Sequence, residues 1–147
     1  MDQKHLASFK IKILALQYKD EIRKTVAKMK YQDEMDFLVS HEPRNKFIKN
    51  LALSLEGNTL LLFQYVEKHG KILQEMIESE ANGRKVFFIH GGVKGEERDE
   101  IRGIVEKKEM LSLLLVMVLS LPVLTLEIYI LSYLHHPPNP RFEIFSL

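Results

Sequence analysis

The sequence contains no cysteine, and its 147 residues carry a formal net charge of only +1. Without thiols the chain can form no disulfide framework, no thiolate nucleophile and no cysteine-ligated zinc site. A net charge close to zero removes the strongly basic character of many nucleic-acid-binding domains. The first residues also lack an apolar segment followed by a cleavage site, so no signal peptide is expected.

Well-known nucleotide-binding and catalytic motifs are absent as well. The sequence has no G-x-x-x-x-G-K-[ST] phosphate loop, no G-x-G-x-x-G, no G-x-S-x-G and no H-E-x-x-H. Composition and spacing therefore predict no catalytic residue and no metal site. They also give this chain no evident means of holding a nucleoside triphosphate by itself.

Apolar residues make up 46% and charged residues 28% of the chain, which is enough to build a core. The charges are unevenly distributed, because all but three of the 21 basic and 20 acidic residues lie within residues 1–109. The three exceptions are Glu127, Arg141 and Glu143. Leucine dominates the uncharged run over 110–126. We therefore expect an α/β domain over 1–109, followed by an apolar tail over 110–147 that is helical or disordered and lies outside the native domain.

Apolar periodicity predicts the elements of the charged part. Strands are expected over residues 9–13, 59–64 and 85–90, and helices over 20–39, 43–55, 72–77 and 96–105. The second and third strands are apolar without alternation, which is typical of strands covered on both faces in a parallel sheet. Strand, helix, strand and helix at this spacing predict right-handed βαβ crossovers.

Two of these strand–loop–helix segments resemble superfamily two DNA helicases. Residues 60–71, L-L-L-F-Q-Y-V-E-K-H-G-K, are similar to motif IV and the helix that follows it. Residues 86–93, followed by Glu97-Arg98 and Ile101, are similar to the next motif of the second RecA-like domain. The upstream stretches 31–34 and 44–48 extend the resemblance to UvsW-type DNA helicases of T-even phages. The resemblance covers roughly residues 1–109.

This resemblance implies an incomplete second RecA-like domain, an α/β fold whose parallel sheet is flanked by helices. Intact helicases of this family use ATP and Mg²⁺ to unwind DNA and to drive branch migration in phage recombination and repair. Their phosphate loop and D-E-x-H motif lie in a first domain, and neither motif is in this chain. Motifs V and VI are missing too. We therefore expect a truncated fragment in the host cytoplasm that is inactive and binds no cofactor on its own.

By the same resemblance, two loops would face branched or single-stranded DNA. The residues implied in DNA binding are Gln64, Tyr65, Lys71, His90, Gly91, Gly92 and Lys94. Glycines suit such loops because exposed backbone N–H groups can approach phosphate closely. The two lysines would add positive charge, whereas Arg98 is equally suited to an ion pair within the domain.

The apolar tail is compatible with a shift of the reading frame. Read one nucleotide out of register, the helicase-like stretch N-A-I-I-V-A-S-Y-G gives residues 110–118, and T-F-S-T-G gives residues 119–123. Near the end, F-A-S-P-S-K-S gives residues 134–140. The hidden frame then contains S-T-G of motif V and Q-S-I-G of motif VI in the expected order, with a stop codon directly after Leu147. We therefore expect that residues 110–147 were never selected to fold with the preceding domain.

Two other functions remain open from the sequence. Residues 110–134 are long enough to span a bilayer as one helix with Lys107-Lys108 at its cytoplasmic end, although Pro122 and Glu127 interrupt the run. This pattern predicts a small single-pass membrane protein. A stand-alone DNA-binding module would instead keep the helicase-like part and bind DNA in a salt-dependent manner.

Overall fold

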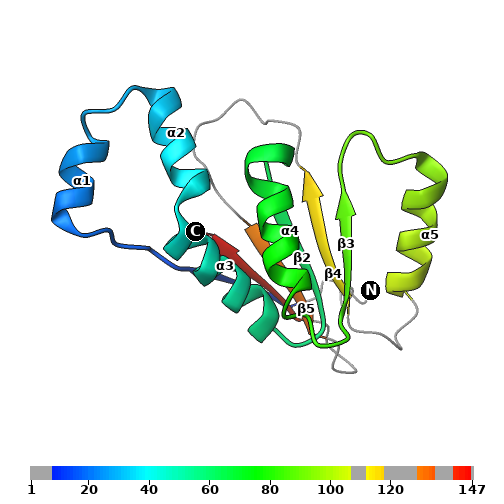
Figure 1. Ribbon diagram of the computed structural model, residues 1–147. Helices are drawn as coiled ribbons and strands as arrows, with labels where there is room; N and C mark the ends of the chain where they lie inside the picture. The colour runs from blue at the N-terminus through cyan, green and yellow to red at the C-terminus, as the bar shows by residue number, and fades with distance from the viewer. Residues whose placement is uncertain (1–7, 107–111, 118–128, 135–140, 147) are drawn as a thin grey trace, which may run out of the picture.

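The computed structural model describes residues 8–106, 112–117, 129–134 and 141–146. Within these ranges the strands form one six-stranded sheet in the order β1-β6-β5-β2-β4-β3 (Figure 1). The strands are β1 (Ser8–Ile13), β2 (Asn58–Phe63), β3 (Lys85–Ile89), β4 (Ser112–Met117), β5 (Tyr129–Leu134) and β6 (Arg141–Ser146). The helices are α1 (Asp20–Val26), α2 (Tyr31–Ser40), α3 (Glu42–Ser54), the π-helical turn η1 (Val66–Gly70), α4 (Lys71–Glu78) and α5 (Gly95–Glu106).

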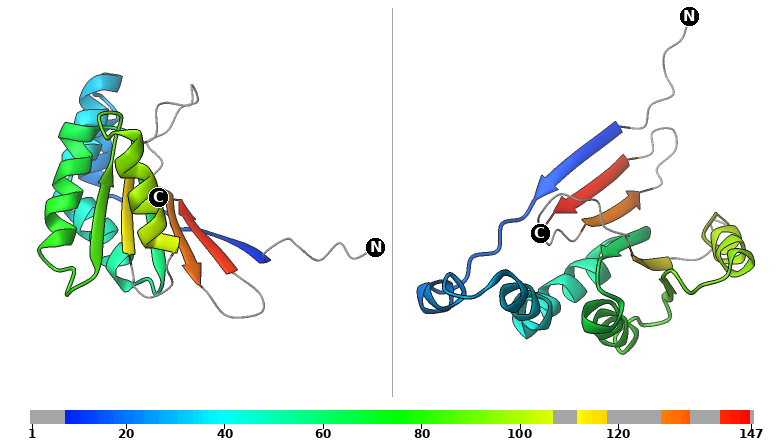
Figure 2. Two further views of the ribbon diagram at one scale, coloured as in Figure 1. Left: turned by 90° about the vertical axis from the view of Figure 1, so that its right-hand side faces the viewer. Right: turned by 90° about the horizontal axis from the view of Figure 1, so that it is seen from above.

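Strand β4 lies between β2 and β3 and is parallel to both. Helix α4 connects β2 to β3, and α5 follows β3 and precedes β4 along the chain. These two crossovers run in opposite directions across the sheet, so right-handed connections place their helices on opposite faces. Figure 2 shows α3 and α4 on one face and α5 on the other. The expected cover on both faces is only partial, because β2 is buried at alternate residues, Thr59, Leu61 and Phe63, and β3 contains no fully buried residue.

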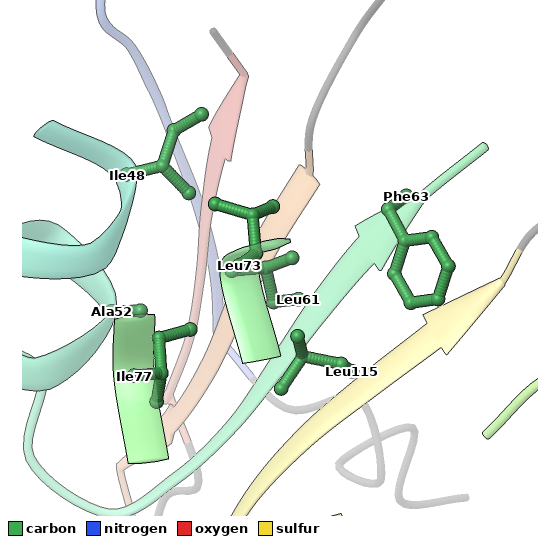
Figure 3. Packing of buried hydrophobic residues seen from close by; sticks show 7 residues of the cluster. All are labelled: Ile48, Ala52, Leu61, Phe63, Leu73, Ile77 and Leu115. Carbon is green, nitrogen blue, oxygen red and sulfur yellow. The ribbon is translucent and has the colours of Figure 1, made fainter. Parts of the chain in front are cut away.

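The core lies between the sheet and the layer formed by α3 and α4 (Figure 3). Its buried members are Ile48 and Ala52 from α3, Leu61 and Phe63 from β2, Leu73 and Ile77 from α4, and Leu115 from β4. Each of these side chains is at most 2% exposed. Burying an aliphatic side chain of this size contributes about 1.5–3 kcal/mol, so this cluster is the main source of stability in this part of the chain.

Arg84, directly before β3, ties α3 to the amino ends of the central strands. Its Nη1 donates to the carbonyl oxygens of Ala52 and Leu55 at 3.2 and 3.0 Å, where the end of α3 leaves such groups without helical partners. Its Nη2 donates to the Thr59 hydroxyl at 2.7 Å, to the Gly57 carbonyl and to the Ser112 carbonyl at 3.4 Å. Burial lowers the pKa of Arg84 from its ordinary value. The guanidinium nevertheless stays charged in the accessible pH range, because arginine does not deprotonate in proteins.

The predicted elements of the charged part are confirmed, with one exception. The expected helix over 20–39 is two helices, because the turn after Val26 closes with short-range bonds from Lys28 N–H to Thr25 O and from Met29 N–H to Val26 O. Extended backbone at Lys30 then starts α2 in a new direction. The apolar stripes expected on α3 and α4 are confirmed, because Ile48, Ala52, Leu73 and Ile77 are fully buried. Phe47 and Ile72 lie at the margins of these stripes and are 36% and 37% exposed.

The expectation of a helical or disordered tail is wrong for the described residues of 110–147, which form β4, β5 and β6. The same finding corrects the proposed single membrane helix over 110–134. A continuous apolar run can form either a helix or a buried strand. Here it forms a strand, because β2 and β3 leave room between them for β4, which pairs with both. Leu115 is 0% exposed there. The expected boundary near Glu109 lies outside the described residues.

The sheet is also mixed rather than parallel as predicted. Strand β5 is antiparallel to both β2 and β6, while β6 is parallel to β1. The short connection over 135–140 accounts for the antiparallel pairing of β5 with β6, since a parallel pair needs a long crossover. Within the described ranges, no helix combines the length and apolar character that crossing a bilayer requires.

Candidate nucleic-acid interface

Two loops leave the same edge of the sheet, because β2 and β3 are both parallel to β4. We call residues 64–71 the exit loop, which follows β2, and residues 90–94 the glycine turn, which follows β3. Every residue that the sequence implied in DNA binding lies in one of these two segments. Ligands of open α/β sheets bind at the carboxyl ends of the strands, so this edge is the candidate site.

The exit loop contains a π-helical turn that only a glycine can complete. The N–H of Gly70 donates to the carbonyl of Tyr65 at 2.8 Å, which closes η1. A Cβ at Gly70 would lie 2.4 Å from Cε2 of Phe63, far inside van der Waals contact. Gln64 is exposed and Tyr65 is half-buried. Single π-turns of this kind occur frequently at functional sites.

A buried histidine anchors the exit loop to α3. His69 is 0% exposed, and its Nε2 lies 3.1 Å from Oδ1 of Asn45. The Asn45 amide nitrogen donates to the carbonyl of Val39 at 2.9 Å, which leaves Oδ1 as the acceptor. His69 therefore donates from Nε2, and its buried Nδ1 has no hydrogen-bond partner in the part of the chain that the structure describes. Burial, and secondly the Arg44 guanidinium, lowers the pKa of His69 from 6.5 to about 3, so the ring is neutral.

The positive charges of the exit loop are compensated by neighbouring carboxylates. Lys71 Nζ lies 2.7 Å from Glu67 Oε2, and Lys68 Nζ lies 2.7 Å from Asp36 Oδ1 on α2. Both pairs are exposed, and the Lys68 contact lowers the pKa of Asp36. Exposed pairs of this kind are weak, so a phosphate group can compete for the lysines.

The glycine turn is closed by its own residues. The N–H of Gly92 donates to Nδ1 of His90 at 3.1 Å, and the N–H of Val93 donates to the His90 carbonyl at 3.1 Å. Arg98 Nη2 donates to that same carbonyl at 2.9 Å, so this arginine links α5 to the glycine turn. These contacts leave the N–H groups of Gly91 and Lys94 as the candidates for a phosphate in this turn.

Charge at the glycine turn is mixed. Lys94 is exposed and forms no ion pair with any described residue. Glu96 and Glu97 follow in the first turn of α5, where they offset the positive end of the helix dipole. Among the described residues, no group of His, Asp or Glu side chains is arranged to hold a metal ion.

Two residues that shape the exit loop were missed from the sequence. Asn45 and His69 are separated by 24 positions, and neither has a pattern that predicts burial. The sequence offered one indication of their importance, since each lies inside a stretch that resembles the helicases. Whether the predicted DNA-binding residues contact DNA stays a prediction, although the structure brings all of them to one edge.

Comparison with known proteins finds a similarity to the ATP-dependent DNA helicase uvsW of Enterobacteria phage T4. The two are 29% identical over 109 residues, which is 72% of this chain and 21% of the helicase. The chain thus spans about a fifth of the length of that relative. No protein-family model and no solved structure matches the chain. The predicted relationship to a phage DNA helicase is confirmed.

Proposed function

We propose that this chain derives from the second RecA-like domain of a UvsW-type DNA helicase and that its exit loop and glycine turn bind the DNA backbone. The similarity to the phage helicase is the observation that carries the proposal. The position of both loops at the carboxyl edge of parallel strands supports it, since this edge is where α/β folds bind ligands.

The chemistry of the two loops favours phosphate rather than base recognition. Gly91 is exposed with open space around it, so its backbone can approach a phosphate closely. Lys94 adds an ammonium group, and Lys71 can exchange the Glu67 carboxylate for a phosphate. The near-zero net charge keeps the affinity modest, and each phosphate that a lysine neutralises adds to its dependence on salt. We propose branched or single-stranded DNA as the partner of these loops.

ATP hydrolysis is not proposed for this chain by itself. The sequence lacks a phosphate loop and a D-E-x-H motif, so nothing in it would hold the triphosphate and its magnesium ion. We infer that turnover requires those missing parts, and that the site of action is the cytoplasm of an infected cell. An ATPase assay of the chain with forked DNA is expected to show no turnover.

We also propose that residues 110–147 are encoded one nucleotide out of register with a helicase gene. Strand β4 is compatible with this origin, because the shifted reading replaces I-I-V-A by S-L-L-L at residues 112–115, and three of these four residues are again apolar. A buried strand can therefore form between β2 and β3 in either frame. The nucleotide sequence across codons 105–150 tests the proposal. A neighbouring frame without S-T-G and Q-S-I-G would refute it.

A stand-alone DNA-binding module is the second candidate, and one observation favours it. Strands β4 and β5 pair with β2 on its two sides, and Leu115 completes the core. The tail therefore supplies strands and a core residue to the same sheet as the helicase-like part, which is expected of a module that acts by itself. Both candidates place DNA at the same edge, and they differ in whether the missing helicase parts are needed for the chain's activity.

Fluorescence anisotropy with a labelled DNA fork tests the proposed site. We expect binding at low salt that weakens steeply as salt rises, and Lys94→Ala is expected to lower the slope of log K against log salt by about one. Lys85→Ala is the matched control, because Lys85 is exposed at the opposite end of β3. Equal losses in both variants, or no binding of the wild-type chain at low salt, would contradict the proposal.

A further inference from the structure

We propose that the exit loop and the glycine turn are coupled through a ladder of three rings, Phe63, Phe88 and His90, so that they act as one preorganised edge. The coupling itself is a property of the fold. Its importance for DNA binding rests on the function proposed above. It assigns positioning roles to Gly70, Phe63 and Phe88, and it changes the role expected for His90.

The first step joins the exit loop to β2. The backbone of Gly70 lies against the ring of Phe63, since a Cβ there would be 2.4, 2.7 and 2.8 Å from three of the ring atoms. Phe63 is 2% exposed and belongs to the core cluster (Figure 3). A close-packed core transmits displacement instead of absorbing it. Any movement of η1 is therefore passed to this ring.

The second step crosses the sheet from β2 to β3. The rings of Phe63 and Phe88 are stacked, with centroids 5.1 Å apart and an interplanar angle of 10°. Strand β4 lies between their strands, and its Leu115 is in register with Phe88 on one side and with Leu61 on the other. The stack thus connects two strands that are not hydrogen-bonded to each other.

The third step reaches the glycine turn. The rings of Phe88 and His90 are tilted, with centroids 5.6 Å apart. Nδ1 of His90 accepts the N–H of Gly92 at 3.1 Å. A Cβ at Gly92 would lie 3.0 Å from Cε1 of the same ring, so the turn packs closely on the imidazole. The position of His90 therefore sets the geometry of the turn.

The ladder fixes both loops before any ligand arrives. Because Nδ1 of His90 is occupied by Gly92, the ring acts as a positioning group for the neighbouring N–H groups of Gly91 and Lys94. Loops that are already ordered lose less conformational entropy on binding, which increases affinity. A disturbance at Gly70 is therefore expected to weaken phosphate contacts in the other loop.

Nuclear magnetic resonance of the full ¹⁵N-labelled chain tests the ladder. Gly70→Ala pushes the Phe63 ring, and Phe88→Leu interrupts the stack between the strands. In both variants we expect hydrogen exchange at the Gly92 amide to accelerate about fivefold or more, as loss of an ordinary hydrogen bond gives. Gly103→Ala is the control, because a Cβ at that position in α5 meets nothing within 4 Å. It is expected to leave exchange at Gly92 unchanged.

The wild-type chain provides a measurement that does not depend on the variants folding. Nuclear Overhauser contacts are expected from the Gly70 α-protons to the Phe63 ring and from the Phe88 ring to the His90 ring. Their absence would overturn the ladder, as would unchanged Gly92 exchange in both test variants. Intact coupling without any binding to a DNA fork would instead refute the proposed function and leave the ladder standing.

Discussion

Acid should destabilise this chain through His69. The ring is fully buried and neutral, with a pKa of about 3 in the folded chain against 6.5 when it is exposed. Between these two values the unfolded chain binds more protons than the folded chain, so the free energy of unfolding falls as pH falls. From pH 8 to pH 5 this single group should cost about 2 kcal/mol, and each further unit of acid costs about 1.4 kcal/mol until pH approaches the folded value.

Urea unfolding followed by circular dichroism at pH 8, 7, 6 and 5 measures this effect. His69→Gln removes the titration and keeps a side chain that can donate to Asn45, so the difference between wild type and variant should shrink by about 2 kcal/mol from pH 8 to pH 5. Ile77→Val is the control, since it loses about 1 kcal/mol of core packing at every pH. The His69→Gln and wild-type curves running parallel over this range would refute a buried neutral histidine.

Substitutions at three other residues test separate parts of the structure. Arg84→Met leaves several backbone carbonyls without a donor and should lower the free energy of unfolding by about 2–4 kcal/mol, as measured by thermal unfolding. Arg84→Lys should restore little of this loss, because one ammonium group cannot replace the planar guanidinium. Leu115→Ala should cost about 2–5 kcal/mol if β4 completes the core, and no loss of stability would show that β4 does not pack there. Asn45→Ala orphans both the His69 N–H and the Val39 carbonyl and should cost about 2–4 kcal/mol in urea unfolding, whereas a change below about 0.5 kcal/mol would contradict the buried pair.

Local patterns in the sequence predict most of the elements before β4. The continuous apolar runs of β2 and β3 predict buried strands, and the stripe around Leu73 and Ile77 predicts α4, because each pattern lies within a single element. The break between α1 and α2 was missed, since both halves carry helical spacing and the turn is set by backbone bonds at Thr25 and Val26.

The low charge of the tail predicts a segment outside the domain, whereas its pattern of apolar residues predicts a buried strand. Residues 112–117 are as continuously apolar as β2, and the same rule that predicts a strand there applies to β4. What the sequence alone does not contain is the vacant position between β2 and β3, which depends on contacts between distant segments. The pairing of His69 with Asn45 is of the same kind, as is the ladder from Phe63 to His90.

The candidate site could be located from the sequence but not described. Resemblance predicted the two loops, and the parallel strands place both at one edge. Hydrogen bonds inside the glycine turn were not predicted, and one of them occupies the Gly92 N–H, whereas DNA contact at this turn stays a prediction. The pairing of Lys71 with Glu67 likewise changes its expected role from a free charge to one that must exchange partners.

Titration of the ¹⁵N-labelled chain with a short DNA fork tests the central claim most directly, because it reports where the DNA lies. We expect the largest amide shift changes at Gln64, Lys71, Gly91 and Lys94, with those at Gly83 and Arg84 on the opposite edge unchanged. Higher salt should reverse the changes. Shift changes centred on Gly83 and Arg84, or none at low salt, would contradict a DNA-binding edge formed by the exit loop and the glycine turn.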